Sequence, residues 1–510
     1  MVVDSTPDPT PSRRRPEPLT RLRSGPGAAL ITATVLASMA GFLDANVVTV
    51  AVPAIGRDLH AGVVALQWTL TGYLLTAAAL LLVGGSLADR YGRRRVLATG
   101  LVVMLVASVV CAVATTTGLL VAGRVVQGVG AALVVPSSLA LLNGALRVAD
   151  RAAGIGVWAG LASLGGLVGP FVGGWLIDHW SWRAVFLLNV PLLLAGLLAL
   201  LPVPESVAGH GRFSLDTAGA LLAVLGLAGV IDGLTTGTTA GWSSPRVVIG
   251  LVVGVACLIA LVPVERRLPA PMLKLSLFTS RQFSAINVAT VVLYGALAAA
   301  SYLLVLRCQL TLGYSATAAG AVLIPSSVLF LALSPVSGAL VPRVGPRVLM
   351  TAGIVCIGLG FGWLAVSGSG SYAATILPGV LLWGLGIGLT VTPLTAAVLA
   401  AVDDGDLGEA SAISDVAARV GAAVLVAFVP VLIGVRSGRG LADALTAGYR
   451  PAMTVLAALC AVAAVVSAVF VRAGREAGPR FAPPAPHGCA LPHAATTTRV
   501  LTTARTGETA

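Results

Sequence analysis

Long apolar runs separated by short polar or charged loops dominate the pattern of this chain. Fourteen runs approach or exceed the roughly 20 residues that an α-helix needs to cross a bilayer. They cover residues 28–52, 64–88, 96–115, 118–142, 152–177, 184–203, 216–236, 247–264, 284–307, 317–341, 347–367, 374–401, 412–434 and 450–472. The pattern predicts an all-α polytopic membrane protein. The flanking segments 1–27 and 473–510 are polar and rich in proline and arginine, so we expect disordered tails there.

Composition narrows the class of protein further. Of the chain, 57% is hydrophobic and only 10% is charged, whereas soluble domains average about 25% charged residues. The net charge of +12 does not point to nucleic acid, because the arginines lie mostly in short loops and tails. The cysteines and histidines lack metal-ligand spacing, and no Walker A motif is present, so we expect neither a metal, a catalytic site nor drive by ATP.

The basic residues set the orientation. Arginines concentrate in alternate loops, such as Arg90 to Arg95 after the second run and Arg266 and Arg267 after the eighth. Cytoplasmic loops carry such an excess of Lys and Arg, so both termini are predicted to lie in the cytoplasm.

An internal repeat predicts two related halves. Gly85 to Arg94 (GSLADRYGRR) resembles Gly338 to Arg347 (GALVPRVGPR), and Gly128 to Val135 resembles Gly384 to Val391 at nearly the same offset. We therefore expect a six-helix bundle over 28–203, a two-helix insert over 216–264 and a second six-helix bundle over 284–472.

The fifth run carries an unusual set of glycines. Gly156 and Gly160, and then Gly165, Gly169 and Gly173, recur every four residues, and Pro170 interrupts the second series. Glycines at this spacing let a neighbouring helix approach closely, and the proline should bend or weaken the helix. The segment indicates either a moving helix or ordinary glycine-mediated packing.

Five motifs together resemble the major facilitator superfamily. Three are its general signatures: Gly85 to Arg94, the R-x-x-Q-G-x-G of Arg124 to Gly130, and the G-x-x-x-G-P-x-x-G-G of Gly165 to Gly174, which marks its proton antiporters. The segments Leu43 to Pro53 and Ser181 to Pro191 are similar to the fourteen-span drug:proton antiporter branch. The resemblance implies two six-helix bundles around a central cavity with two extra helices, in a 6+2+6 order.

Asp44 is the strongest candidate for carrying a proton. It is the one ionisable residue within the first run, where an acid is costly unless it faces the bundle interior. Arg124 in the fourth run lies at a comparable depth from the outer side, and in the family this arginine is tied to proton transfer. Two alternatives remain open: an acid neutralised permanently by a basic partner, and an arginine that only pins helices through backbone carbonyls.

The resemblance implies roles for two further sets of residues. Asp89 would pair with a neighbouring helix end as a conformational latch, in a tight loop with Arg90, Gly92, Arg93 and Arg94, although these arginines also fit simple cytoplasmic anchors. The second-half copy has Pro342 in place of the acid. Gly165, Gly169, Pro170, Gly173 and Gly174 would form the hinge of the antiporter.

Candidates for lining a substrate cavity are less specific. They are Asn46, Tyr73, Gln127, Asp232, Gln309 and Asp415. Asp415 and Arg419 are spaced i, i+4, which favours a self-neutralising pair over a role in binding a cationic drug or a second proton. The position equivalent to Arg124 in the second half is apolar, near Leu382.

The resemblance implies a proton-driven exporter of amphipathic drugs or antibiotics in a bacterial cytoplasmic membrane. Its partners would be the small-molecule substrate, protons and the lipid bilayer, with no cofactor besides the proton gradient and no nucleic acid, and it would act as a monomer. The alternative is an exporter or symporter of another small solute on the same fold.

Overall fold

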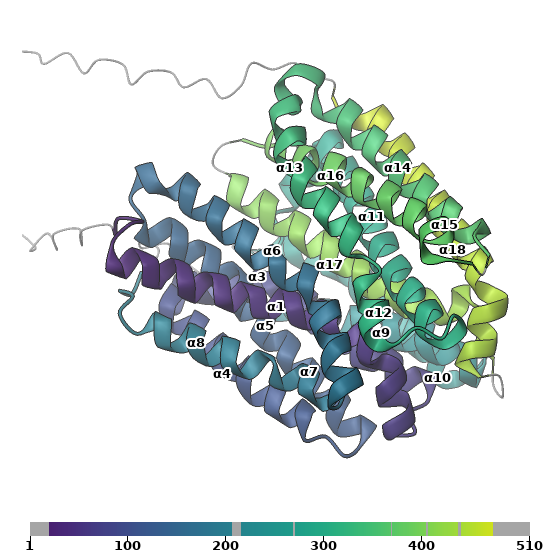
Figure 1. Cartoon of the computed structure of the whole chain (residues 1–510). Helices are drawn as coiled ribbons and strands as arrows, with labels where there is room; N and C mark the ends of the chain where they lie inside the picture. Colours follow the sequence, from purple (N-terminus) through teal and green to yellow (C-terminus); the bar gives the residue numbers. More distant parts are fainter. Residues whose placement is uncertain are drawn as a thin grey trace, which may run out of the picture.

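The structure is a bundle of long helices (Figure 1). This computed structural model describes residues 20–206, 216–268, 271–368, 370–403, 406–436 and 440–472. Within these ranges, thirteen helical segments are long and apolar enough to cross a membrane, and α2 with α3 makes a fourteenth span bent by 48°. Within the described residues, β structure is limited to one isolated bridge between Thr20 and Leu146. The prediction of an all-α polytopic fold is confirmed.

The helices group into two bundles and an insert. The N-terminal bundle contains α1 (Gly25–Asp58), α2 (Val63–Ala79), α3 (Leu81–Tyr91), α4 (Arg93–Ala112), α5 (Thr117–Ala145), α6 (Val148–His179), α7 (Arg183–Leu187) and α8 (Asn189–Leu200). The insert contains α9 (Thr217–Ala240) and α10 (Pro245–Arg267), followed by the 3-10 turn η1 (Leu275–Thr279). The C-terminal bundle contains α11 (Arg281–Leu306), the π-helical turn η2 (Arg307–Thr311), α12 (Ala316–Ala321), α13 (Ile324–Val344), α14 (Pro346–Val366), α15 (Tyr372–Thr375), α16 (Leu377–Leu399), α17 (Leu407–Leu432) and α18 (Leu441–Phe470).

The two bundles repeat the same close helix contacts. A Cβ added to Gly130 on α5 would lie 3.0 Å from the Gly100 carbonyl oxygen on α4, and one added to Gly386 on α16 would lie 2.5 Å from that of Gly353 on α14. Gly92 and Gly345 both adopt positive φ, 106° and 86°, at the end of a helix. Side chains other than glycine rarely adopt this conformation, so the repeat preserves packing and turns alike.

The insert packs against the seam between the bundles. Leu227 and Ile231 of α9 share one apolar cluster with Leu75 of α2 and with Ala423 and Ala427 of α17. The insert therefore contacts both halves through α9, whereas α10 leaves most of its side chains exposed to the surroundings.

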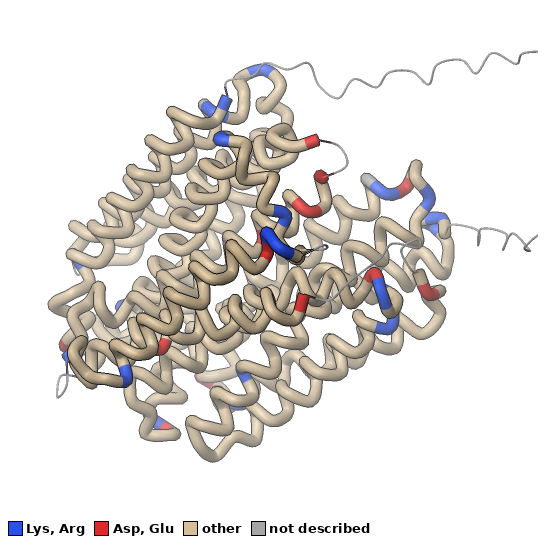
Figure 2. The backbone as a smooth tube through the Cα atoms, turned by 180° about the vertical axis from the view of Figure 1, so that it is seen from behind, with Lys and Arg blue, Asp and Glu red and all other residues tan. Residues whose placement is uncertain are grey.

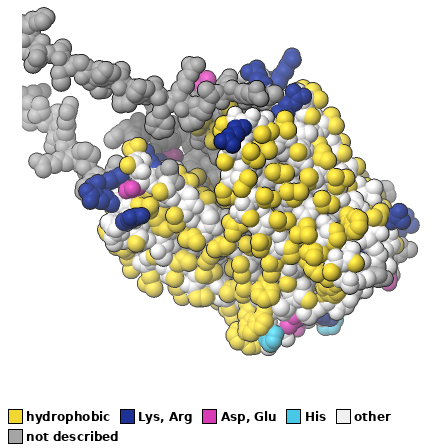
Figure 3. Space-filling view, turned by 45° about the horizontal axis from the view of Figure 1, so that its top comes forward, with side chains coloured by type: hydrophobic (Ala, Val, Ile, Leu, Met, Phe, Trp, Pro, Cys, Tyr) yellow, Lys and Arg dark blue, Asp and Glu magenta, His cyan; other side chains and the backbone are white. Residues whose placement is uncertain are grey.

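The surface is that of a membrane protein. Hydrophobic side chains cover most of the face in Figure 3, and the basic residues gather at its edge. Figure 2 shows most Lys and Arg on one side of the bundle, at the ends of α3, α10 and α13 where the basic loops lie. By the positive-inside rule this side faces the cytoplasm.

The outer ends of the bundles are joined. The Asp178 carboxylate at the end of α6 accepts hydrogen bonds from Ala316 N (3.1 Å), Thr317 N (2.8 Å) and Thr317 Oγ1 (2.6 Å) at the start of α12. Gln309 Nε2 of η2 donates to Val50 O of α1 at 3.0 Å. One apolar core also joins the outer half of the N-terminal bundle to the C-terminal bundle. The structure is therefore an outward-closed form.

Part of the predicted N-terminal tail is ordered, contrary to expectation. Thr20 N donates to Ala145 O at 2.9 Å, Leu22 N donates to Asp150 Oδ2 at 3.1 Å, and Ser24 caps α1 by accepting from Gly27 N. The backbone groups of 20–27 thus bind the α5–α6 loop and start a helix. The rest of that tail, residues 1–19, and the tail over 473–510 lie outside the described residues.

Candidate functional site

The Asp44 side chain is completely buried in the N-terminal bundle. Because α1 extends to Asp58, beyond the predicted run, Asp44 lies near the middle of the helix rather than close to its outer end. An ionised carboxylate at this depth requires compensating polar partners. Two other helices of the bundle, α5 and α8, supply them.

Arg124 on α5 forms an ion pair with Asp44. Its Nη1 donates to Asp44 Oδ2, and its Nε donates to Thr69 O on α2 at 2.9 Å. The Arg124 side chain is only 1% exposed. The predicted pairing is confirmed, and the helix-pinning contact to a backbone carbonyl exists beside it.

Two amides complete the shell around the carboxylate. Asn189 Nδ2, at the start of α8, donates to Asp44 Oδ1 at 2.7 Å, and Gln127 Nε2 donates to the same oxygen at 3.3 Å. Gln127 also accepts from Arg124 Nη1 at 2.9 Å and donates to Ser108 on α4 at 2.8 Å. Arg124 and Gln127 are three residues apart, so one face of α5 presents both.

Aromatic rings pack against the guanidinium of the ion pair. The Arg124 guanidinium carbon lies 4.5 Å from the centre of the Tyr73 ring and 5.9 Å from that of Phe186. Tyr73 donates its hydroxyl to Gly41 O at 2.9 Å. Tyr73 and Gln127 were predicted to line a cavity, and this is wrong for the present form, because both are buried within the polar cluster.

The glycines of α6 contact both bundles. A Cβ at Gly165 or Gly173 would collide with Met39 or Val47 of α1, and one at Gly174 would collide with the Ala316 carbonyl of α12. The close packing predicted for this series is thereby confirmed. Gly169 is looser, with its nearest neighbours in α1 at an ordinary 3.4 Å.

The first glycine series has no packing role in this form. Nothing lies within 4 Å of a Cβ built on Gly156 or Gly160, so the predicted contact there is wrong. Pro170 does not break the helix, since α6 runs from Val148 to His179 without interruption. Its carbonyl instead lies against Gly320 of α12, where a side chain would collide with it.

The loop after α3 is held by salt bridges and caps. Asp89 Oδ1 accepts from Arg93 Nη2 at 2.9 Å, at the first residue of α4, and Arg93 Nη1 donates to Ala140 O at 3.0 Å. Arg94 donates to Leu200 O and Leu201 O at the end of α8. Asp89 thus pairs with the next helix along the chain.

Glu205 also holds the loop after α3, although its role was not predicted from the sequence. Its carboxylate accepts from Arg94 N (2.9 Å) and Arg95 N (3.2 Å), which caps the N-terminus of α4. A side chain at Gly92 would collide with this carboxylate, so Gly92 is required by the contact as well as by its φ.

Three further cavity candidates are already engaged. Asp232 on α9 accepts from Trp68 Nε1 (3.3 Å) and pairs with Arg246 (3.2 Å), so it ties the insert to α2 instead of lining a cavity. Gln309 belongs to the outer closure, as described above. Asp415 pairs with Arg419 at 3.3 Å, as the spacing predicted, while the Asp415 side chain stays 45% exposed.

Asn46 keeps an exposed side chain. It lies beside Gly166 and donates to Phe42 O within its own helix at 2.8 Å. Of the cavity candidates, Asn46 and Asp415 therefore retain polar atoms that a small molecule could reach. Among the described residues, no group of three or more His, Cys, Asp or Glu side chains could hold a metal ion.

Known proteins resemble the chain closely enough to establish its family. It is 34% identical over 401 residues to the multidrug resistance protein Stp of Mycobacterium tuberculosis, covering 77% of this chain and 73% of that protein. It is 32% identical over 469 residues to the cephamycin export protein CmcT of Amycolatopsis lactamdurans, covering 90% of this chain and 96% of that protein.

Solved structures agree on the fold. A D-xylose-proton symporter matches with a TM-score of 0.62 and 16% identity, over 88% of this chain and 98% of that chain. A peptide transporter matches with a TM-score of 0.65 and 16% identity, over 88% and 95%. The model of the Major Facilitator Superfamily matches residues 34–426. The chain therefore belongs to the major facilitator superfamily and is a multi-pass protein of the cytoplasmic membrane.

Proposed function

We propose that this chain exports amphipathic drugs or antibiotics in exchange for protons that enter the cell. The observation that carries the proposal is the fully buried Asp44–Arg124 pair inside a membrane-spanning bundle. Ionisable groups inside membrane proteins mark proton and ion pathways. The names of the related proteins, which concern multidrug resistance and cephamycin export, support the substrate class.

In this mechanism Asp44 carries the proton. The ionised carboxylate is held by Arg124, Asn189 and Gln127, so the present form suits the state after the proton has left. Asn189 Oδ1 is buried and, within the described residues, lacks a hydrogen-bond partner. Rotation of this amide would offer Oδ1 to a protonated Asp44, so one side chain serves both protonation states.

The glycines of α6 would allow the bundles to rock. Gly165 and Gly173 lie against α1, which carries Asp44, and Gly174 lies against α12 of the other bundle. A movement of α6 that opens the outer side must separate Asp178 from the start of α12. This coupling of one helix to both partners supports a hinge formed by Gly165, Gly169, Pro170, Gly173 and Gly174.

The loop after α3 would act as the latch of this movement. Asp89 with Arg93, and Arg94 with the end of α8, hold the cytoplasmic ends of the N-terminal bundle together. Gly92 supplies the turn, and Arg90 remains an exposed cation beside it. In the proposal the loop moves as a unit with α4.

Asn46 and Asp415 would contact the substrate, the proton gradient alone would drive export, and a single chain would suffice. Transport of a different small solute on the same fold is the competing function, and it is an outcome of the experiment below.

Everted membrane vesicles test the proposal. Respiration acidifies their interior, and a substrate added outside should enter in exchange for protons, which raises the fluorescence of a quenched pH probe. Cephamycin, puromycin and ethidium form the first panel. We expect at least one compound to collapse part of the gradient in wild-type vesicles and none to do so with Asp44→Asn.

Asp58→Asn is the matched control. Asp58 lies on the same helix but pairs with Arg183 at the outer surface, outside the buried cluster. It should retain export. Silence of the wild type across a broad drug panel would contradict the substrate class, and wild-type activity of Asp44→Asn would remove Asp44 from proton transfer.

A further inference from the structure

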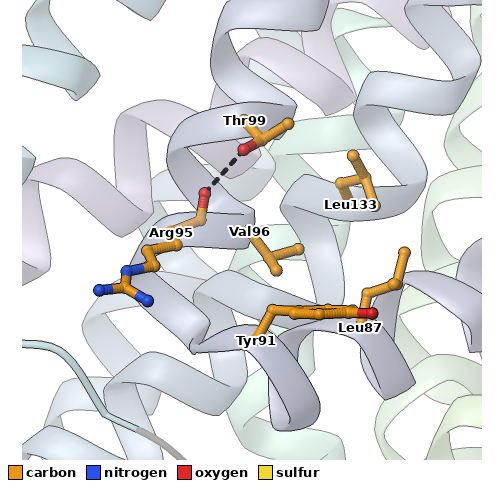
Figure 4. Close-up of a pocket in the computed structure, with 6 residues that line it drawn as sticks. All are labelled: Leu87, Tyr91, Arg95, Val96, Thr99 and Leu133. Carbon is orange, nitrogen blue, oxygen red and sulfur yellow. Dashed lines mark hydrogen bonds between the residues drawn. The ribbon is translucent and has the colours of Figure 1, made fainter.

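An apolar groove opens on the outside of the N-terminal bundle, between α3, α4 and α5. It is lined by Leu87 and Tyr91 of α3, by Arg95, Val96 and Thr99 of α4 and by Leu133 of α5, and its volume is about 310 Å³. Figure 4 shows the Tyr91 ring across one end, while the Arg95 guanidinium extends away from the apolar residues. The groove is separate from the buried Asp44 cluster.

The groove continues into the membrane-facing side of α4. Exposed side chains follow Arg95 and Thr99 at Val102, Val106, Val109 and Val113, spaced three and four residues apart. This spacing places them on one face of the helix, which lipid must cover. Arg95 therefore lies at the cytoplasmic end of a continuous apolar strip on α4.

Two cations at this end have weak protein partners. The Arg95 side chain is 80% exposed, and its Nε lies 3.8 Å from Glu205 Oε2, whose carboxylate already accepts hydrogen bonds from three backbone N–H groups. Arg90 stacks over Tyr91 at 5.2 Å. The nearby Asp89 is taken by Arg93. The groove thus combines apolar walls with accessible positive charge at the membrane boundary.

We propose that this groove binds an anionic phospholipid of the inner leaflet. The phosphate would lie on Arg95, with Arg90 beside it, and one acyl chain would lie between α3, α4 and α5. A negative headgroup suits the exposed and weakly paired Arg95 with Arg90 beside it, and the apolar walls suit a hydrocarbon chain. Because Arg95 follows the capped turn at Gly92, the lipid would contact the same loop as Asp89 and Glu205.

Native mass spectrometry of the full chain in mild detergent tests the site. Purified protein is mixed with phosphatidylglycerol or with phosphatidylcholine, and retained lipid is counted. We expect wild type to retain phosphatidylglycerol in preference to phosphatidylcholine. Arg95→Gln should lower phosphatidylglycerol binding about fivefold, the effect of one basic residue near an anionic lipid.

Matched variants separate this groove from general lipid contact. Thr99→Trp fills the groove and should lower binding, whereas Val106→Trp adds the same ring two turns further along α4 and should not. Arg266→Gln removes a cytoplasmic arginine elsewhere and should also bind as wild type. Unchanged binding in both Arg95→Gln and Thr99→Trp, or equal retention of the two lipids by wild type, would overturn the proposal.

Two further experiments identify the class of ligand and test whether lipid binding is independent of transport. Glycerol phosphate, which has the headgroup charge but no acyl chain, should fail to displace phosphatidylglycerol. Efficient displacement would make the groove a site for soluble anions and would overturn the lipid assignment. Asp44→Asn should bind phosphatidylglycerol as wild type does, so failure of the lipid site and failure of proton coupling are distinguishable.

Discussion

The two six-helix bundles share a packing plan and differ in what lies at their centres. Gly128 lies against the Tyr73 carbonyl of α2, and Gly384 lies against the Ser326 carbonyl of α13, at equivalent places in the repeat. Four residues earlier the N-terminal bundle has Arg124, whereas the C-terminal bundle has buried Val380. Helix packing is thus retained in both halves, while the fully buried ion pair lies, among the described residues, in the N-terminal half.

This difference separates the contacts that build the fold from the residues that carry the chemistry. Close glycine contacts depend on backbone shape alone, so a duplicated backbone retains them. The Asp44 cluster combines groups from α1, α2, α4, α5 and α8, so each charged member would be costly without the others. The N-terminal cluster should therefore respond to substitution as one unit, and the glycine contacts should respond as scaffold.

Removing the cation should have the largest effect on stability. Arg124→Met leaves Asp44 buried without its ion-pair partner, which costs about 3–5 kcal/mol. Val380→Ala at the equivalent place should cost only about 2 kcal/mol, the loss of apolar contact. Thermal unfolding of the purified protein measures both. If Arg124→Met combined with Asp44→Asn is no more stable than Arg124→Met alone, the two side chains do not act as a unit.

The α6 glycines should divide into sensitive and tolerant positions. Gly174→Ala places a Cβ against the Ala316 carbonyl and should destabilise the outward-closed form by about 1–3 kcal/mol, with transport reduced about tenfold. Gly156→Ala meets open space and should be neutral or stabilising by up to about 1 kcal/mol. Vesicle transport, normalised to the amount of protein, compares the two. Equal transport by both variants would leave the series without a role in movement.

Loss of the Glu205 cap should have a moderate effect. Glu205→Ala removes the acceptor for two N–H groups at the start of α4 and should lower stability by about 1–2 kcal/mol. The C-terminal bundle differs at the first residue of the helix, where α14 has Pro346 without an N–H and α4 has Arg93, whose N donates to Ser206 O. Thermal unfolding measures this, and a melting temperature of Glu205→Ala equal to that of the wild type would contradict the prediction.

The smallest effect is expected at a surface ion pair of the cytoplasmic side. Lys274 pairs with Asp406 at the start of α17, and this hydrogen bond raises the pKa of the Lys274 ammonium above its ordinary value. The raised pKa keeps the ammonium charged throughout neutral pH, so the contribution of Lys274 is present there and is lost as the pH rises through that raised pKa. Lys274→Gln should change the melting temperature less than Glu205→Ala at pH 7. A larger change would show that this loop controls the bundle interface.

Much of the fold follows from the sequence because the membrane imposes it. Apolar runs of spanning length have few alternatives to helices in hydrocarbon, so the spans, their number and the repeat are predictable. Helix ends beyond the hydrocarbon are not fixed in this way. The continuation of α1 to Asp58 and the ordered segment from Thr20 depend on contacts with other loops.

The candidate site was predictable in part. Asp44 and Arg124 stand out because charge is rare within an apolar run. Asn189 and Glu205 do not stand out in this way. Asn189 is an uncharged amide, and Glu205 follows a span, where polar residues are common. Asn189 did lie within the motif from Ser181 to Pro191, so a signal existed. Its direction toward Asp44 depends on the packing of α8 against α1, which spacing along the chain does not define.

Proton release by the purified transporter tests the central claim most directly. The protein is placed in weakly buffered detergent solution with a pH indicator, and a compound that collapsed the gradient in vesicles is added. If Asp44 carries the exchanged proton, wild type releases up to about one proton per chain as substrate binds, and Asp44→Asn binds the compound but releases none. Equal release by the two proteins would contradict the assignment of the transported proton to Asp44.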